Sequence, residues 1–270
     1  MTVSRLSGLV LVSLLLLPAC GASSELSTEE LAAKIARKLD TAEGQIPNNR
    51  LKEARESYQW VLSKAPANAR AHQGLGRIAL DEKDWVTAEA ELNKAIATQA
   101  NDPETHGALG ALYRKTERWA QAAGAFAKAH ELDPENATYA LRWGATLRKA
   151  GKAAEAETVL REVGENDPEE KFVWTELGDA LRDQNKLDAA LKVYMKAQKT
   201  YASDKGARVG AAAVYESKGE HTLAINELSE YVRMDCCSHY SDDVVKPKLD
   251  ALRQKEQDAL GDKPPHAAQP

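Results

Sequence analysis

The side chains of this sequence best suited to binding are arginines that recur at a constant interval. They are Arg114, Arg148 and Arg182, and Asp179 and Asp183 flank the last of them. A guanidinium binds a carboxylate through two parallel hydrogen bonds, so the arginines predict binding of acidic side chains or of a terminal carboxylate. The two aspartates would partly neutralise Arg182, which makes Arg114 and Arg148 the stronger candidates.

Residues arranged for catalysis are not found. The sequence has no phosphate-binding glycine loop, no nucleophile elbow and no HExxH zinc motif. Its six histidines are scattered, and His72 and His106, which are separated by the same interval as the arginines, are interpreted as packing residues. We therefore predict a protein that is not an enzyme, with no catalytic residue, no cofactor and no metal.

Cys236, Cys237 and His239 form the one unusual cluster, and three interpretations of it are open. The cysteines could form a vicinal disulfide. A metal site would need a fourth ligand, for which Asp235 and Asp242 are poor candidates. The favoured interpretation is that Cys236 is a small core residue, and the redox state of the pair stays open.

Composition limits the classes of function. The chain has 270 residues, 43% of them hydrophobic, and a formal net charge of −5. An acidic balance argues against nucleic-acid binding, which needs a basic surface. Three cysteines exclude a disulfide scaffold. No run of apolar residues is long enough to span a bilayer.

The N-terminus has the pattern of an export signal. Arg5 precedes an apolar run of ten residues from Gly8 to Leu17, which is the length of a signal-peptide core. Leu17-Pro18-Ala19-Cys20 follows and resembles the bacterial lipoprotein box. The resemblance implies removal of residues 1–19, acylation of Cys20 and a tether over residues 20–27. Gly21 then implies sorting to the outer membrane, and an ordinary secretory signal is the alternative.

The rest of the chain is built from repeats of equal length, with a period of about 34 residues. Units begin at Ala69, Pro103, Ala137, Lys171 and Lys205. The eighth position is always small, and its residues are Gly76, Gly110, Gly144, Gly178 and Ala212. The twentieth position is always alanine, at residues 88, 122, 156, 190 and 224. The twenty-fourth position is always large, and its residues are Leu92, Phe126, Leu160, Tyr194 and Leu228.

This pattern resembles tetratricopeptide repeats. The resemblance implies an all-α, right-handed solenoid of about six helical hairpins, in which small residues let the two helices of a hairpin approach closely. We expect a degenerate N-terminal repeat over residues 28–68, five repeats over 69–238, a capping helix over 239–260 and a disordered tail over 261–270. Pro247 either begins the capping helix or kinks it.

The resemblance also implies where the basic residues lie. In stacked tetratricopeptide hairpins the first helices line a concave groove, into which positions two, five, nine and twelve point. The predicted groove residues are Arg70, Arg77, Arg114, Lys115, Arg148, Lys149 and Arg182. A plainer interpretation stays open, because position twelve lies near a helix C-terminus, where cations interact favourably with the helix dipole.

Together these features predict a lipid-anchored scaffold for envelope proteins. Lipoproteins of this size and repeat number resemble the pilotin-type factors of pilus and secretion machines, above all the lipoprotein of the tight-adherence (Flp) pilus. That resemblance implies the periplasmic face of the outer membrane as location and a secretin as partner, with the membrane contacted through the lipid. The alternative is an adaptor for periplasmic cell-wall hydrolases or proteases.

Overall fold

The computed structural model describes residues 27–261 except residues 171 and 236, and every regular element in that part is a helix. The elements are α1 (Thr28–Gln45), α2 (Leu51–Lys64), α3 (Ala69–Asp81), α4 (Trp85–Thr98), α5 (Pro103–Lys115), α6 (Trp119–Leu132), α7 (Ala137–Lys149), α8 (Ala153–Asn166), α9 (Val173–Asp183), α10 (Leu187–Thr200), α11 (Lys205–Ser217), α12 (His221–Met234), a π-helical turn (Ser241–Val245) and α13 (Lys246–Gly261). The predicted helical solenoid with a C-terminal helix is confirmed. The predicted signal peptide, Cys20 and nearly all of the tether lie outside the described residues.

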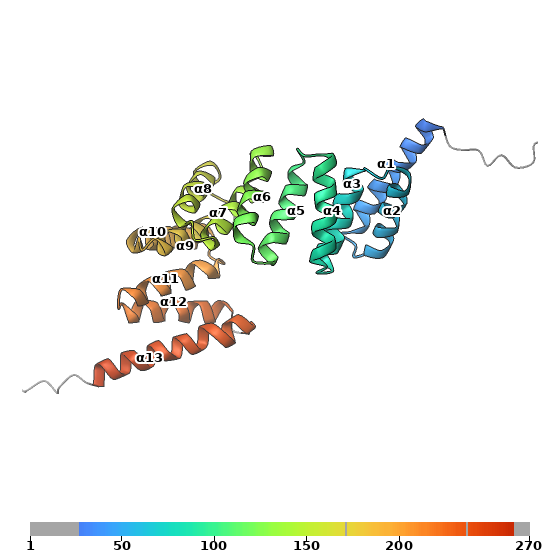
Figure 1. Ribbon diagram of the computed structural model, residues 1–270. Coiled ribbons are helices and arrows are strands. Elements are labelled where there is room, and N and C mark those ends of the chain that lie inside the picture. The colour runs from blue at the N-terminus through green and yellow to red at the C-terminus, as the bar shows by residue number, and fades with distance from the viewer. Residues whose placement is uncertain (1–26, 171, 236, 262–270) are drawn as a thin grey trace, which may run out of the picture.

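Consecutive helices pair into antiparallel hairpins that follow one another in a curved row, from α1 at one end to α13 at the other (Figure 1). The first helices of most neighbouring hairpins also touch one another, and this contact is most extensive among α7, α9 and α11. Helices that touch across several hairpins lie on the inside of the curve. The first helices therefore form the concave face, and the row bends most where α9 lies.

Each hairpin reverses through one residue with a left-handed backbone at repeat position fifteen. The five residues are Lys83, Glu117, Gly151, Asn185 and Gly219, with φ between 57° and 78°. A left-handed residue ends a helix by turning the chain away from the helix axis. Asn49, with φ 57°, plays the same part in the N-terminal hairpin, where five residues rather than three separate the two helices.

The small residue at position eight meets the large residue at position twenty-four within the same hairpin. A Cβ atom on Gly110 would lie 2.8 Å from the Phe126 ring, and one on Gly144 would lie 2.5 Å from Leu160. The alanines at position twenty are fully buried. Interiors packed this tightly leave no room for a larger residue, so the period of small residues determines the spacing of the helices.

The N-terminal hairpin is closed at its start by a capping box. The Ser27 side chain accepts a hydrogen bond from the Glu30 backbone, and the Glu30 carboxylate accepts one from the Ser27 backbone. Such reciprocal bonds satisfy two donors that the first turn of a helix leaves unpaired. Tyr58 and Val61 of α2 then pack against Ile78 of α3, which joins this hairpin to the regular repeats.

At the other end, the π-helical turn runs directly into α13. Pro247 therefore does not begin a helix, because helical residues run without a break from His239 into α13. The π-helical turn, in which the Lys246 N–H bonds to the Ser241 carbonyl, stands directly before the proline, which cannot donate a backbone hydrogen bond. Val245, Leu249 and Leu252 are buried against the last hairpin. Gly261, assigned to the tail by the sequence, is instead the last residue of the helix, and residues 262–270 lie outside the described part.

Cys237 is disulfide-bonded, to a cysteine that lies outside the described residues. The predicted packing role of Cys236 also lies outside them. Within the described part, no group of three or more histidine, cysteine, aspartate or glutamate residues could hold a metal ion.

Candidate partner-binding groove

Three hollows follow one another along the concave face. The first, of about 430 Å³, lies between α3 and the N-terminal hairpin and includes Arg70 and Glu43. The second, of about 380 Å³, spans α3, α5 and α7 and includes Arg77, Ala111 and Arg142. The third, of about 690 Å³, lies between α9, α11 and the segment after α12. The concave face is therefore a groove with separate compartments.

Four exposed cations lie on α5 and α7, two of the helices that line the second hollow, and we call them the central basic patch. They are Arg114, Lys115, Arg142 and Lys149. Arg142 is the one that lines the hollow itself. Leu80 and Asp81, which hold repeat positions twelve and thirteen, line the second hollow. Arg114 and Lys115 occupy the same two positions one repeat later. None of the four cations forms an ion pair with another described residue.

Arg148, by contrast, is bound by its own chain. Its guanidinium lies 3.3 Å from Glu176, 3.1 Å from Asp179 and 3.3 Å from Asp183, all on α9, and its side chain is only 11% exposed. Arg182 is paired with the same two aspartates at 3.2 and 3.7 Å. The sequence-based preference for Arg148 over Arg182 as an available cation is wrong, because the acidic residues of α9 neutralise both.

The two remaining predicted groove residues are partly occupied. Arg70 reaches back to α1, where it pairs with Asp40 at 3.1 Å and with Glu43 at 2.8 Å. Arg77 lies 3.8 Å from Glu104, a looser pair. Of the seven predicted residues, only Arg114, Lys115 and Lys149 are exposed without an ion pair to the described residues.

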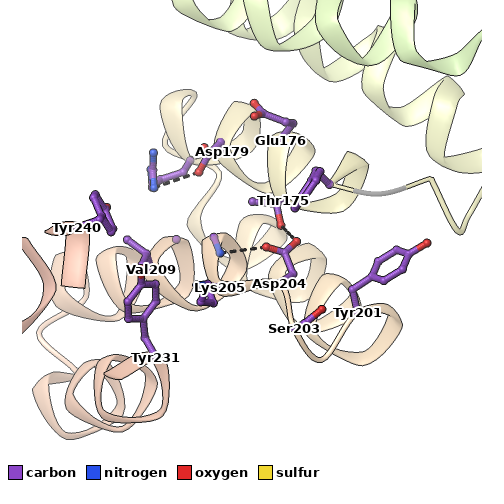
Figure 2. A pocket seen from close by; sticks show the side chains of 14 residues that line it. Thr175, Glu176, Asp179, Tyr201, Ser203, Asp204, Lys205, Val209, Tyr231 and Tyr240 are labelled. Carbon is purple, nitrogen blue, oxygen red and sulfur yellow. Dashed lines mark hydrogen bonds and ion pairs between the residues drawn. The ribbon is translucent and has the colours of Figure 1, made fainter. Parts of the chain in front are cut away.

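The third hollow, which we call the C-terminal cavity, has aromatic walls. Figure 2 shows Tyr231 and Tyr240 on one side and Tyr201 on the other. Phe172, at the start of α9, also lines it and is 49% exposed, as is Tyr240. The rings of Tyr231 and Tyr240 meet edge to face, with centroids 6.1 Å apart. Lys205 lies 6.0 Å from the centre of the Tyr231 ring, so one cation of the chain already stands near these aromatic walls.

Three carboxylates stand among these rings, from Glu176, Asp179 and Asp204 (Figure 2). Asp204 caps α11 by accepting bonds from the backbone N–H groups of Gly206 at 3.0 Å and Ala207 at 3.3 Å. The Thr175 hydroxyl donates to the same aspartate. Asp204 is buried and its acceptors are already used.

Asp179 accepts a hydrogen bond of 2.6 Å from the hydroxyl of Tyr194 on α10. Burial, and then the adjacent Asp179 carboxylate, raise the pKa of Tyr194. The ring fits there because Gly178 and Gly210 have no side chains. A Cβ atom on Gly178 would lie 2.5 Å from the ring, and one on Gly210 would lie 2.3 Å from it.

Glu176 is the least compensated carboxylate of the cavity. Its one ion pair is the 3.3 Å contact with Arg148, which also serves two aspartates. Desolvation raises the pKa of Glu176, although Arg148 acts in the opposite direction, and the neighbouring Asp179 raises it further. The negative charge of Glu176 is therefore energetically unfavourable in the free protein.

Sequence reasoning missed the residues of this cavity and one member of the basic patch. Phe172 and Val209 hold positions two and five, which the repeat register marks as groove positions. Tyr201 and Tyr240 lie outside the repeated helix positions, so periodicity could not find them. Arg142 holds position six, which was not expected to face the groove.

The histidines at repeat position four are packing residues, as the sequence predicts. The ring Nε2 of His72 lies 2.9 Å from the Pro66 carbonyl, and that of His106 lies 2.8 Å from the Ala100 carbonyl. Trp174, at the same position of the fourth repeat, donates to the Pro168 carbonyl at 2.8 Å. These rings fasten the loop between two repeats to the helix that follows it.

Comparison with known families decides the classification. Tetratricopeptide-repeat families match residues 46–112, 103–136 and 175–235, which together span more than half of the chain. The chain belongs to the tetratricopeptide-repeat family. Among curated proteins, no sequence match was found. No helix within the described residues is long and apolar enough to cross a membrane.

Several solved tetratricopeptide structures have a similar fold. PilF of Pseudomonas aeruginosa is 16% identical with a TM-score of 0.64, and the match covers 79% of this chain and 97% of PilF. PilW, a type IV pilus biogenesis factor, is 18% identical with a TM-score of 0.66, covering 78% and 98%. YrrB, a tetratricopeptide protein with an unusual peptide-binding site, is 18% identical with a TM-score of 0.57, covering 71% and 99%. At these identities the likeness shows the fold.

Proposed function

We propose that this protein is a non-enzymatic scaffold that holds an acidic segment of an envelope protein in its concave groove. The central basic patch carries this proposal, because its four exposed cations form no ion pair with another described residue and Arg142 lines the second hollow of the groove. An extended acidic segment laid along α5 and α7 would pair with them. Each charge-assisted hydrogen bond of this kind contributes about 1.5–3 kcal/mol.

Two further observations support a proposal about the assembly in which the scaffold works. PilF and PilW have the same fold, and PilW is described as a type IV pilus biogenesis factor. The lipobox at Cys20 supports a lipid anchor on the periplasmic face of the outer membrane. We therefore propose a pilotin-like factor that assists assembly of an outer-membrane secretin, of the tight-adherence type.

A genetic test separates the groove from the anchor. In cells lacking this protein, we expect the secretin subunit to accumulate without forming its outer-membrane multimer, and the wild-type chain to restore the multimer. Arg114→Ala with Lys149→Ala removes two cations of the patch and should fail to restore it. Lys192→Ala with Lys199→Ala removes two exposed lysines of α10, outside the groove, and should restore it fully.

The anchor is tested in the same cells with Cys20→Ala. This variant should leave the outer-membrane fraction, since the lipid is the proposed membrane contact. Normal multimers in cells carrying the Arg114/Lys149 variant would contradict the groove proposal. Recovery of a cell-wall hydrolase or protease with the wild-type chain, in place of the secretin, would support the adaptor alternative.

A further inference from the structure

We propose that the C-terminal cavity holds a lysine or arginine side chain of the bound segment. The inference rests on the proposed function, because it assumes that a protein segment lies along the groove. It also predicts how that segment is oriented: its acidic part lies over α5 and α7, and a basic residue lies between α9 and α11. The reasons are the shape, the walls and the charge of the cavity.

The shape and walls suit a long side chain with a charged end. A volume of about 690 Å³ accommodates such a side chain together with part of its backbone. Phe172 and Tyr240 are each 49% exposed, and Tyr201 and Tyr231 complete the walls. Aromatic faces attract cations through the ring quadrupole, and they also cover the apolar stem of lysine or arginine.

The charge of the cavity is negative once its ion pairs are counted. Five carboxylates lie in or directly beneath it, from Glu176, Asp179, Asp183, Asp204 and Asp235. Four cations face them, from Arg148, Lys149, Arg182 and Lys205. Lys205 is bound by Asp235, and both arginines are shared among the acids of α9. One negative charge therefore stays uncompensated.

Glu176 is the acceptor that an entering cation would reach. Only Arg148 pairs with it, through a single carboxylate oxygen at 3.3 Å. Its side chain is 27% exposed, and this partial burial raises the pKa of the carboxyl group. A lysine ammonium or an arginine guanidinium supplies the missing charge and hydrogen bonds. A carboxylate would instead meet an excess of like charge.

Short peptides of defined sequence test the inference. The probes are heptapeptides of glycine, acetylated and amidated at their ends, with lysine, arginine, norleucine or glutamate in the middle. Binding is measured at low salt by NMR, from the backbone amide signals of the residues lining the cavity. The lysine and arginine peptides should bind about tenfold more tightly than the norleucine peptide, which corresponds to about 1.4 kcal/mol.

Two variants and a control test whether the C-terminal cavity causes the preference for lysine and arginine peptides. Glu176→Gln should abolish the preference for lysine over norleucine. It should fold, because it removes an unfavourable charge while Asp179 and Asp183 still hold Arg148. Tyr240→Ala removes an exposed wall and should weaken the lysine peptide several-fold. Glu162→Gln changes an exposed carboxylate of α8, outside the groove, and should change nothing.

The outcomes also separate this inference from the proposed function. Arg114→Ala with Lys115→Ala should leave lysine-peptide binding intact while reducing binding of a glutamate-rich heptapeptide. Loss of only the second activity would confirm two independent sites. The inference is overturned if norleucine or glutamate peptides bind as tightly as lysine peptides. It is also overturned if lysine peptides do not bind, or if Glu176→Gln leaves the preference unchanged.

Discussion

The central basic patch and the C-terminal cavity lie in one groove and share an arginine at repeat position twelve, yet they differ in charge. The first helix of the repeat after that of Arg114 is α7, whose positions six, nine and thirteen are Arg142, Ala145 and Lys149. Arg148 faces α9, whose same positions are Glu176, Asp179 and Asp183, and all three are paired with it. The next repeat therefore decides whether an arginine is available to a partner.

This difference teaches how a solenoid of near-identical units acquires distinct binding sites. The arginine and its repeat position are the same in both regions, and three side chains of the following helix differ in charge. The packing differs as well, because α9 touches α7 more extensively than α7 touches α5. The account therefore predicts that charges moved between helices also move the binding preference.

We expect the largest loss of affinity when acidic residues, placed as they are on α9, are introduced into α7. Arg142→Glu with Lys149→Asp removes two cations and places two carboxylates beside Arg114, as in the next repeat. We expect the affinity for a glutamate-rich heptapeptide to fall about 100-fold or more, measured by calorimetry at low salt. Lys192→Glu with Lys199→Asp makes the same charge change on α10 and should reduce it far less. If the α7 variant loses less than about threefold in affinity, the charges of α7 do not determine whether the groove binds an acidic peptide.

A second variant disturbs the cavity while sparing the patch. Gly210→Ala places a Cβ atom 2.3 Å from the Tyr194 ring, so the ring must move and loosen its bond to Asp179. Overpacking of this kind costs about 1–3 kcal/mol of unfolding free energy. Lysine-peptide binding should weaken, and glutamate-peptide binding should not.

The matched control is Gly124→Ala on α6, where a Cβ atom meets nothing within 4 Å. Alanine is the better helix former, so this variant should gain about 0.5–1 kcal/mol. Denaturant unfolding measures both changes. Equal stability of the Gly210 and Gly124 variants would mean that Tyr194 is not held where the structure places it.

A third prediction compares the two arginines by stability. Arg148→Ala leaves three carboxylates close together without their shared cation, and we expect a loss of about 2 kcal/mol, allowing for their partial exposure. Arg114→Ala removes an exposed and unpaired side chain and should change stability by less than about 0.5 kcal/mol. Urea unfolding of both variants checks this. A larger loss for Arg114→Ala would reverse the assignment of structural and binding roles.

The smallest expected effect is a pH dependence at Glu176. The groups that face it are Arg148 and Lys149 of α7 and Asp179 of α9. Its pKa is raised above 4.5, so the native state binds a proton more tightly than the unfolded state does. Acidification through that range therefore stabilises the fold at this residue.

Binding of a cation depends on pH in the opposite direction, because the cation binds only the ionised carboxylate of Glu176. Lowering the pH from neutral towards the ordinary range of glutamate should weaken the lysine peptide several-fold in the wild type and hardly at all in Glu176→Gln. The stability gained by that variant at neutral pH should shrink over the same range. Parallel pH profiles of the two proteins would contradict the role given to Glu176.

The fold could be predicted from the sequence because its determinants recur at the same positions of every repeat. The small residues Gly110 and Ala122 indicate where the two helices of a hairpin approach closely, and the large residue Phe126 fills the space between the helices. Gly151 and Asn185, at the left-handed turn positions, are residue types that such turns favour. Local rules determine these features, and each repeat confirms the others.

The groove was predicted in outline and missed in detail for a physical reason. The three contacts of Arg148 join residues 28, 31 and 35 positions apart, and their offset follows from how one repeat rests on the next. Composition and spacing within one repeat do not reveal them. The C-terminal cavity depends on the sharp bend at α9 and on the irregular segment that carries Tyr240, and neither is periodic.

Photocrosslinking in cells shows directly whether the partner binds in the concave groove. The crosslinker p-benzoylphenylalanine is placed at Ala111, which lines the middle of the groove, or at Thr158, which lies on α8 outside it. The account predicts an adduct from Ala111 to an acidic segment of an envelope protein, lost when Arg114→Ala and Lys149→Ala are added. An adduct from Thr158 alone, or one at Ala111 that persists in the double variant, would contradict it.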